Sequence, residues 1–124
     1  MASPEFSCDV LARYLPEQSD PGAQAYAFAY TVTIRNTGDV PAQLIGRHWL
    51  IKDASGQTQE VRGLGVIGHQ PLLQPGEQFE YTSWTRIAAP RGEMRGTYFC
   101  MSDKAEAFET PIAPFELSMA QALH

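Results

Sequence analysis

The clearest pattern in the chain is an alternation of large with small or polar residues in the segment AYAFAYTVTIRN, residues 25–36. The large residues, at every second position, are Tyr26, Phe28, Tyr30, Val32 and Ile34. Successive side chains of a β-strand point to opposite faces, so this period of two predicts a strand with one buried face. We therefore expect these five side chains to belong to the core.

Further extended segments follow along the chain, separated by turn-forming runs such as NTGD, DASGQ and QPGE. The predicted strands cover residues 6–15, 25–36, 42–53, 58–62, 77–87, 94–103 and 108–117. A short helical turn is conceivable only in SMAQALH, at 118–124. Seven short strands predict an all-β sandwich of the immunoglobulin or fibronectin type III-like kind. The fibronectin-like form is favoured because the Cys, Trp, Cys spacing of true immunoglobulin domains is missing.

Two segments carry information about their place in a sheet. In residues 42–53, alternation would put Ile45, Trp49 and Ile51 on one face and Leu44, His48 and Leu50 on the other. Apolar residues on both faces indicate a central strand. The last segment, FETPIAPFEL, contains prolines at 111 and 114, which cannot donate ladder hydrogen bonds and therefore suit an edge strand.

Size and charge narrow the range of functions. The 124 residues fit one domain, 1–124, and the 44% hydrophobic and 19% charged residues are typical of a globular protein. The formal charge of −5 disfavours nucleic acid and anionic membranes as main partners. Because the chain shows neither a signal peptide nor a run of about 20 apolar residues, we expect a cytoplasmic protein.

The residues that could carry chemistry do not form a recognisable constellation. Cys8 and Cys100 lie far apart without a CxxC pair, so we expect buried free thiols in a reducing cytosol. Ser83 and Cys100 lack an identifiable base, and no G-x-S-x-G elbow is present. We expect neither an enzyme nor a cofactor.

A metal site is not expected either. The three histidines, His48, His69 and His124, do not have the spacing of metal ligands. We interpret His48 as a structural residue and His124 as part of the tail. The carboxylates considered as ligands are expected to be solvated; they are Asp53, Glu60, Glu77, Glu80 and Glu93.

The segment RGLGVIGHQP contains a GxGxxG pattern made by Gly63, Gly65 and Gly68. In a dinucleotide-binding domain this pattern opens a helix, and Pro71 and Pro75 prevent a helix here. One interpretation is structural: the glycines supply positive φ and close backbone approach at a corner between sheets. The alternative is an anion-binding nest of backbone N–H groups. Arg62 and His69, with Arg47 on a neighbouring strand, are the candidate cationic groups for that nest.

Four stretches together resemble the bacterial ApaG family. They are RHWLIKDASG, VRGLGVIGHQPLLQPGEQFEYTSW, PRGEMRGTYFCM and IAPFEL. The family signature that they resemble comprises a G-x-G-V-x-G-x-Q-P loop, a P-G-E turn and a G-x-M-x-G-x-Y segment. Two positions depart from the family pattern, since Trp84 stands where glycine is common and Ala89 where threonine is common.

The resemblance implies a fibronectin type III-like sandwich that serves as a binding module. Members are linked to cobalt resistance and magnesium efflux, and related domains occur in eukaryotic F-box and polymerase-interacting proteins. We therefore expect a non-enzymatic domain that binds a partner protein, with a connection to divalent cation homeostasis. The resemblance also implies the alternative, a small-anion or pyrophosphate-binding protein that uses the glycine-rich loop 63–68.

Overall fold

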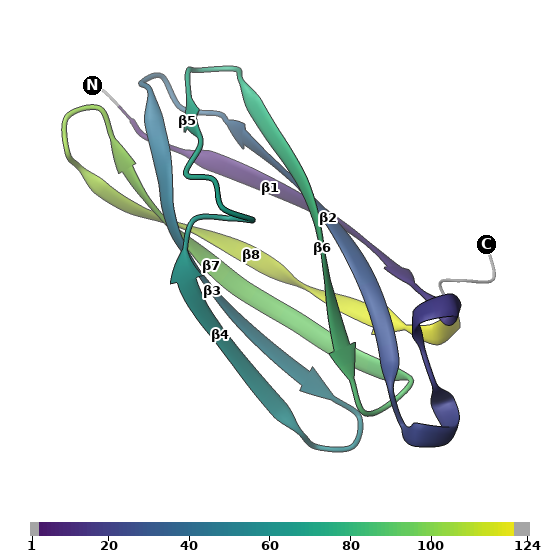
Figure 1. Ribbon diagram of the computed structural model, residues 1–124. Coiled ribbons are helices and arrows are strands. Elements are labelled where there is room, and N and C mark those ends of the chain that lie inside the picture. Colours follow the sequence, from purple (N-terminus) through teal and green to yellow (C-terminus); the bar gives the residue numbers. More distant parts are fainter. Residues whose placement is uncertain (1–2, 121–124) are drawn as a thin grey trace.

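The computed structural model describes residues 3–120, which form two antiparallel sheets packed face to face (Figure 1). The strands are β1 (Phe6–Tyr14), β2 (Tyr26–Asn36), β3 (Ala42–Asp53), β4 (Thr58–Leu64), β5 (Leu72–Leu73), β6 (Gln78–Ile87), β7 (Arg91–Ser102) and β8 (Ala107–Ser118). Two 3-10 turns, η1 (Pro16–Gln18) and η2 (Pro21–Ala23), connect β1 to β2. The predicted all-β sandwich is confirmed. Residues 121–124, which include His124 and most of the candidate helical turn, lie outside the described part of the chain.

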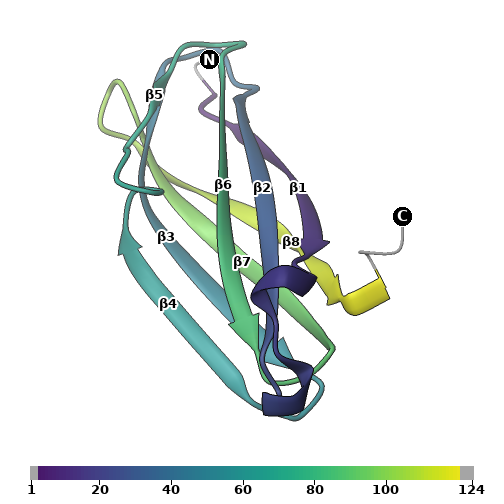
Figure 2. The same ribbon diagram turned by 45° about the vertical axis from the view of Figure 1, so that its right-hand side comes forward.

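The three-stranded sheet has the order β1-β2-β6, and the five-stranded sheet has the order β4-β3-β7-β8 with β5 paired to β3. Figure 2 shows the first sheet lying across the strands of the second. Strand β3 is hydrogen-bonded on both sides, which confirms the central position predicted for it. Strand β8 pairs with β7 alone, as its two prolines require of an edge strand.

All seven predicted strands are present, and the structure adds β5. This strand has two residues, which pair with Ala42 and Gln43 of β3. A pair of leucines is too short to produce a period of two, so the sequence pattern does not reveal it. The first strand ends at Tyr14, just before Pro16 begins the η1 turn.

The core is built on the alternating face of β2, as predicted. Phe28, Val32 and Ile34 are fully buried, and Tyr30 is 7% exposed, whereas Tyr26 at the strand end is only partly buried. Tyr30 also joins the two sheets, because its ring centroid lies 5.5 Å from that of Trp49 on β3 in an edge-on contact. Trp49 makes further edge-on contacts with Tyr98 at 6.1 Å and Phe115 at 6.0 Å. Contacts of this geometry stabilise beyond the burial of their area.

Strand β3 contains a β-bulge that corrects the predicted assignment of its faces. Its register with β7 shifts between Leu44 and Gly46, which leaves Ile45 as an extra residue. An extra residue reverses the alternation from that point on. Leu44 is therefore buried on the same side as Trp49, whereas Ile45, predicted to share the face of Trp49, is only partly buried.

We predict that Phe28→Ala lowers the free energy of unfolding by about 3–5 kcal/mol, because it removes a fully buried ring and leaves a cavity. Denaturant unfolding monitored by circular dichroism measures the change. The matched control is Phe99→Ala, which removes the same side chain from a position 38% exposed and should cost much less. Equal losses for the two variants would contradict the core assignment.

Candidate functional site

The glycine-rich loop links β4 to β5 and is anchored on the β-bulge. Strand β4 ends at Leu64 and β5 begins at Leu72, and both strands pair with β3. The carbonyl oxygen of Ile45, the extra residue of the bulge, accepts a hydrogen bond from Gly65 N at 2.8 Å and another from Gln70 Nε2 at 2.9 Å. One carbonyl of β3 therefore holds both ends of the loop.

The tip of the loop is a two-residue turn. Val66 N donates to His69 O at 2.8 Å, and His69 N donates to Val66 O at 2.9 Å. The two residues between them, Ile67 and Gly68, have φ angles of 42° and 82°. Positive φ at both central residues is the requirement of a type I′ turn, for which asparagine followed by glycine is preferred. Val66 itself is fully buried, so the turn is fixed to the core.

The three glycines are required for different physical reasons. A Cβ at Gly63 would lie 2.8 Å from Arg47 Nη1, so a side chain there would displace the guanidinium of Arg47 from its place against the loop. A Cβ at Gly65 would collide with the carbonyl oxygen of His69, and φ there is 63°. Gly68 has space around it but a φ of 82°. Any side chain at Gly65 would therefore alter the loop itself.

The glycine-rich loop does not lie at a corner between the two sheets, where the structural interpretation of its glycines placed it. Positive φ and close approach are both found, but the predicted corner between the two sheets is wrong. Strands β4 and β5 belong to the same sheet, and the chain crosses to the other sheet only after β5, through residues 74–77. The prediction failed because β5, which keeps the chain in the five-stranded sheet, is too short to be recognised.

The backbone groups of the loop are largely engaged within the fold. The amides of Gly65, Val66 and His69 all donate to carbonyl groups of the protein. Arg47 Nη1 donates in turn to the carbonyl oxygens of Leu64 at 3.1 Å and Gly65 at 2.9 Å. An anion at the loop would have to rely on other donors. Anion binding by Gly63, Gly65 and Gly68 stays a prediction.

The other two cationic candidates, Arg62 and His69, lie in separate surroundings. Arg62 is exposed on β4, and its Nη2 lies 3.7 Å from Glu60 Oε2. The His69 ring instead packs near Phe79 of β6, with ring centroids 5.7 Å apart. His48 Nε2 is 2.9 Å from Glu60 Oε2, consistent with its interpretation as a hydrogen-bonded structural residue. The hydrogen bond from His48 and the charge of Arg62 lower the pKa of Glu60.

An exposed group of apolar side chains lies on the outer face of the five-stranded sheet, next to the loop. We call it the apolar patch; its members are Leu64, Leu72, Phe99 and Met101, which are 77%, 58%, 38% and 39% exposed. Gly46 of β3 pairs with both Leu64 and Phe99, and Gln43 pairs with both Leu72 and Met101. The four side chains therefore stand in neighbouring rows on the two sides of β3. Grouped exposed apolar residues are typical of interaction surfaces.

Ile67, at the tip of the loop, is a further exposed apolar residue, and it lies outside the apolar patch. It is 54% exposed, and its φ is 42°. Positive φ is a strained conformation for a β-branched residue, with a cost on the order of 1–3 kcal/mol. Because the side chain is not buried, packing in the core does not explain why isoleucine occupies this position. Backbone strain of this kind is concentrated at functional sites, so Ile67 is a candidate contact residue.

Sequence reasoning singled out the glycines of this region and missed its apolar residues. Leu64, Ile67 and Leu72 alternate with glycines and a proline in the same segment. Leucine and isoleucine in a turn-rich segment are the signal that could have identified them, because loops are usually polar. Phe99 and Met101 could not have been assigned to the group without the pairing of β3 with β7.

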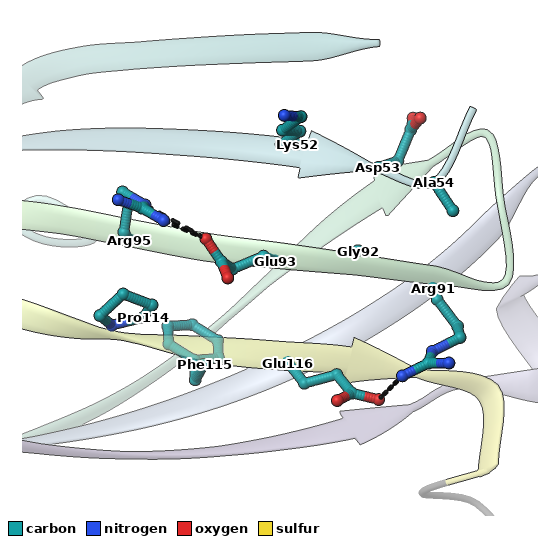
Figure 3. Close-up of a pocket in the computed structure, with 10 residues that line it drawn as sticks. All are labelled: Lys52, Asp53, Ala54, Arg91, Gly92, Glu93, Arg95, Pro114, Phe115 and Glu116. Atoms are coloured by element: carbon teal, nitrogen blue, oxygen red, sulfur yellow. Dashed lines mark hydrogen bonds and ion pairs between the residues drawn. The ribbon is translucent and has the colours of Figure 1, made fainter. Parts of the chain in front are cut away.

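A hollow lies over the ends of β3, β7 and β8 (Figure 3). It encloses about 670 Å³ and is lined mainly by charged side chains. Arg91 Nη2 lies 3.1 Å from Glu116 Oε1, and Arg95 forms an ion pair with Glu93. Figure 3 shows these pairs pointing toward one another, with Lys52 apart from both. Because its charges compensate one another, this hollow offers little to attract a charged ligand.

Asp53 differs from the solvated carboxylate that we expected. Its side chain is 5% exposed and organises the β3–β4 turn. Oδ1 accepts hydrogen bonds from the amides of Ser55 at 2.9 Å and Gln57 at 3.2 Å, and Oδ2 accepts one from Ala88 N at 3.3 Å. Burial raises the pKa of Asp53, but the hydrogen bonds from Ser55, Ala88 and Gln57 outweigh it and hold the pKa below its usual value. The carboxylate is a structural acceptor that links two turns, the one between β3 and β4 and the one between β6 and β7.

The candidate nucleophiles are poorly suited to catalysis. Cys8 and Cys100 are free thiols, as predicted, but only Cys100 is buried, whereas Cys8 is partly buried. Burial raises the pKa of Cys8 to about 12 and that of Cys100 to about 11. Ser83 stands opposite Tyr30 on the neighbouring strand. Residues 3–120 contain no group of three or more His, Cys, Asp or Glu placed to hold a metal ion, and no helix among them is long and apolar enough to cross a membrane.

Comparison with known proteins confirms the resemblance seen in the sequence. The model of the ApaG domain family matches residues 16–102. The chain is 59% identical to protein ApaG of Ralstonia nicotianae over 124 residues, with both chains covered completely. It is 57% identical to protein ApaG of Bordetella pertussis over 120 residues, which are 97% of this chain and 92% of that one. The crystal structure of the putative ApaA protein from Bordetella pertussis superposes with a TM-score of 0.91, at 57% identity over 94% of each chain.

We predict that both thiols of the folded protein react slowly with iodoacetamide at about pH 8, because only the thiolate is nucleophilic. Raised pKa values mean that the thiolate of either cysteine forms only at much higher pH. Mass spectrometry of alkylated protein over time measures the rate. Protein unfolded in guanidinium chloride is the control and should react rapidly at both positions. Rapid alkylation of the folded protein would indicate an activated thiol.

We also predict that Ile67→Asn raises the free energy of unfolding by about 1 kcal/mol, because asparagine tolerates positive φ in a type I′ turn better than isoleucine. Urea unfolding compares the variant with the parent chain. The control Val66→Asn alters the neighbouring, fully buried side chain and should strongly destabilise the fold. A loss of stability in Ile67→Asn would show that Ile67 serves the fold rather than a partner.

Proposed function

We propose that the chain, which belongs to the ApaG family, is a non-enzymatic domain that binds a partner protein through the apolar patch. The observation that carries this proposal is the position of four exposed apolar side chains in neighbouring rows across β3. A surface of this kind gains free energy when a partner covers it, at about 25 cal/mol for each Å² of apolar area removed from water.

The composition of the patch suits protein recognition. Aromatic residues and methionine are enriched at protein interfaces, and here they are supplied by Phe99 and Met101. Both project from β7, a long strand paired on both sides, so the partner would meet a rigid surface. A rigid surface loses little conformational entropy on binding. The partner that fits is one that presents apolar side chains to a flat sheet face.

The surroundings of the patch resemble the polar rim of an interface. The next row of the sheet contains Arg62, His48 and Thr97, which pair across β4, β3 and β7. Arg62 and His48 both contact Glu60, so this rim carries charges of both signs. Such a rim excludes water from an apolar centre and selects partners by charge.

The proposal also covers the cellular context. The two free thiols suit a reducing compartment, so we place the protein in the cytoplasm. The connection to cobalt and magnesium homeostasis that the family resemblance implies would run through the bound partner, since the described residues offer no cluster of metal ligands. Thiols held in the protonated form support a binding role over nucleophilic catalysis.

We predict that the double variant Leu64→Ser/Leu72→Ser loses partner binding, by ten-fold or more in Kd, while the fold is retained. Both side chains are more than half exposed, so their removal costs little stability but withdraws the most accessible half of the apolar patch. Partners captured by the parent chain are identified by mass spectrometry, and their affinity is then measured with purified components by calorimetry. Ile67→Asn should weaken the same interaction if the strained side chain contacts the partner.

The matched control is Leu11→Ser, which removes a leucine of 76% exposure from the outer face of the opposite sheet. It should leave the affinity for that partner unchanged. Equal binding by the parent chain and the Leu64→Ser/Leu72→Ser variant would exclude the patch as the interface. Loss of binding in Leu11→Ser alone would show that the partner binds the outer face of the three-stranded sheet instead.

A further inference from the structure

The outer face of the three-stranded sheet contains a second hollow, distinct from the surface of the proposed function. Ala29 of β2 pairs with Arg13 of β1 on one side and with Trp84 of β6 on the other. The small side chain between two long ones leaves a depression of about 460 Å³, which residues of the segment 15–18 also line. Its volume lies in the range typical of ligand sites.

Trp84 is the dominant apolar group of this hollow and is 62% exposed. The guanidinium carbon of Arg86 lies 5.8 Å from the centroid of its ring, in a cation–π contact. The indole therefore lines the hollow with much of its surface in water. Tryptophan and arginine are the residue types most enriched among the binding hot spots of protein interfaces.

Within residues 3–120, neither arginine of the hollow, Arg13 or Arg86, forms an ion pair with a carboxylate. The printed sequence carries a net charge of −5, and the ion pairs found in residues 3–120 involve Arg62, Arg91, Arg95 and His48, but neither Arg13 nor Arg86. One acidic side chain, Glu17, lines the hollow beside the two arginines. The site is thus a locally cationic surface on an acidic protein, and it fits an anionic ligand.

We propose that this hollow binds an extended peptide segment in which one aromatic residue stands between two acidic residues, each two positions away. The aromatic ring would pack on Trp84 over Ala29, and the flanking carboxylates would accept charge-assisted hydrogen bonds from Arg13 and Arg86. This proposal does not depend on the apolar patch, which lies on the other sheet.

The spacing of the arginines sets the spacing of the acidic residues. Arg13 and Arg86 lie on the two outer strands of the sheet. Arg13 stands opposite Ala29 of the central strand β2, and Arg86 stands opposite Ala27, two residues away. Strand separations of about 4.8 Å and a rise of about 3.3 Å per residue place the two backbone positions about 12 Å apart. In an extended peptide, residues i and i+4 are about 13 Å apart with residue i+2 between them on the same face. The acidic–x–aromatic–x–acidic pattern therefore matches the diagonal from Arg13 to Arg86.

The test uses the ¹⁵N-labelled protein and the peptide acetyl-GESFSEG-amide. The two indole N–H signals are distinguishable, because Trp49 is 2% exposed and Trp84 is 62% exposed. We expect a saturable shift of the Trp84 signal with half-saturation below about 1 mM, and no shift of the Trp49 signal. The peptides acetyl-GQSFSQG-amide and acetyl-GESGSEG-amide, which lack the carboxylates or the ring, should bind at least ten-fold more weakly.

Variants on the same sheet face separate specific recognition from general charge. Arg13→Gln/Arg86→Gln should weaken binding of acetyl-GESFSEG-amide by ten-fold or more. Arg35→Gln is the matched control, since Arg35 is exposed on the same face but pairs with Ser7 and Gln78 at the far end of the sheet, and it should bind as the parent chain does. Three results would each overturn the proposal. Arg35→Gln could weaken binding as much as the double variant, or the peptides without carboxylates or ring could bind as well as acetyl-GESFSEG-amide. The third is a shift of the Trp84 signal with adenosine monophosphate but not with the peptide.

Discussion

The extra residue in β3, Ile45, is the constraint on which the loop and both faces of the five-stranded sheet depend. The bulge lets Leu44 and Trp49 enter the same core although they are five positions apart, an odd separation that a regular strand would place on opposite faces. The carbonyl oxygen of Ile45 accepts hydrogen bonds from Gly65 and Gln70 and so fixes the loop that follows β4. A bulge next to a functional loop is a common way in which sheets redirect side chains.

An alternation of residues with a period of two predicts which side chains are buried only where the strand is regular. The burial of Phe28 on β2 was recognisable, because β2 pairs with both of its neighbours without a register shift. The faces of Leu44 and Ile45 were reversed, since a bulge inserts a residue without a distinctive composition. Ile67 in a type I′ turn was also unpredictable, because local preference disfavours a β-branched residue there.

The candidate site shows the same division between local and nonlocal information. The glycines were found because their requirement is local, and Gly65 illustrates it with positive φ and a close approach to His69. The apolar patch was not found because Leu64 and Phe99 become neighbours only through their common pairing with Gly46. Register across strands is fixed by tertiary packing, and one strand's sequence does not determine which residues stand beside it.

The two outer faces of the sandwich therefore differ in the chemistry that they offer. One presents apolar groups beside a polar rim, and the other presents Trp84 between two arginines that have no acidic partner in residues 3–120. Both are built on strands rather than on loops, so each keeps its geometry whether or not the other is occupied. A core about 10 Å thick separates the sheets, and ligands on opposite faces would not meet. If both faces bind as proposed, the domain would hold two protein segments at once and raise the effective concentration of one toward the other without any change in its own fold.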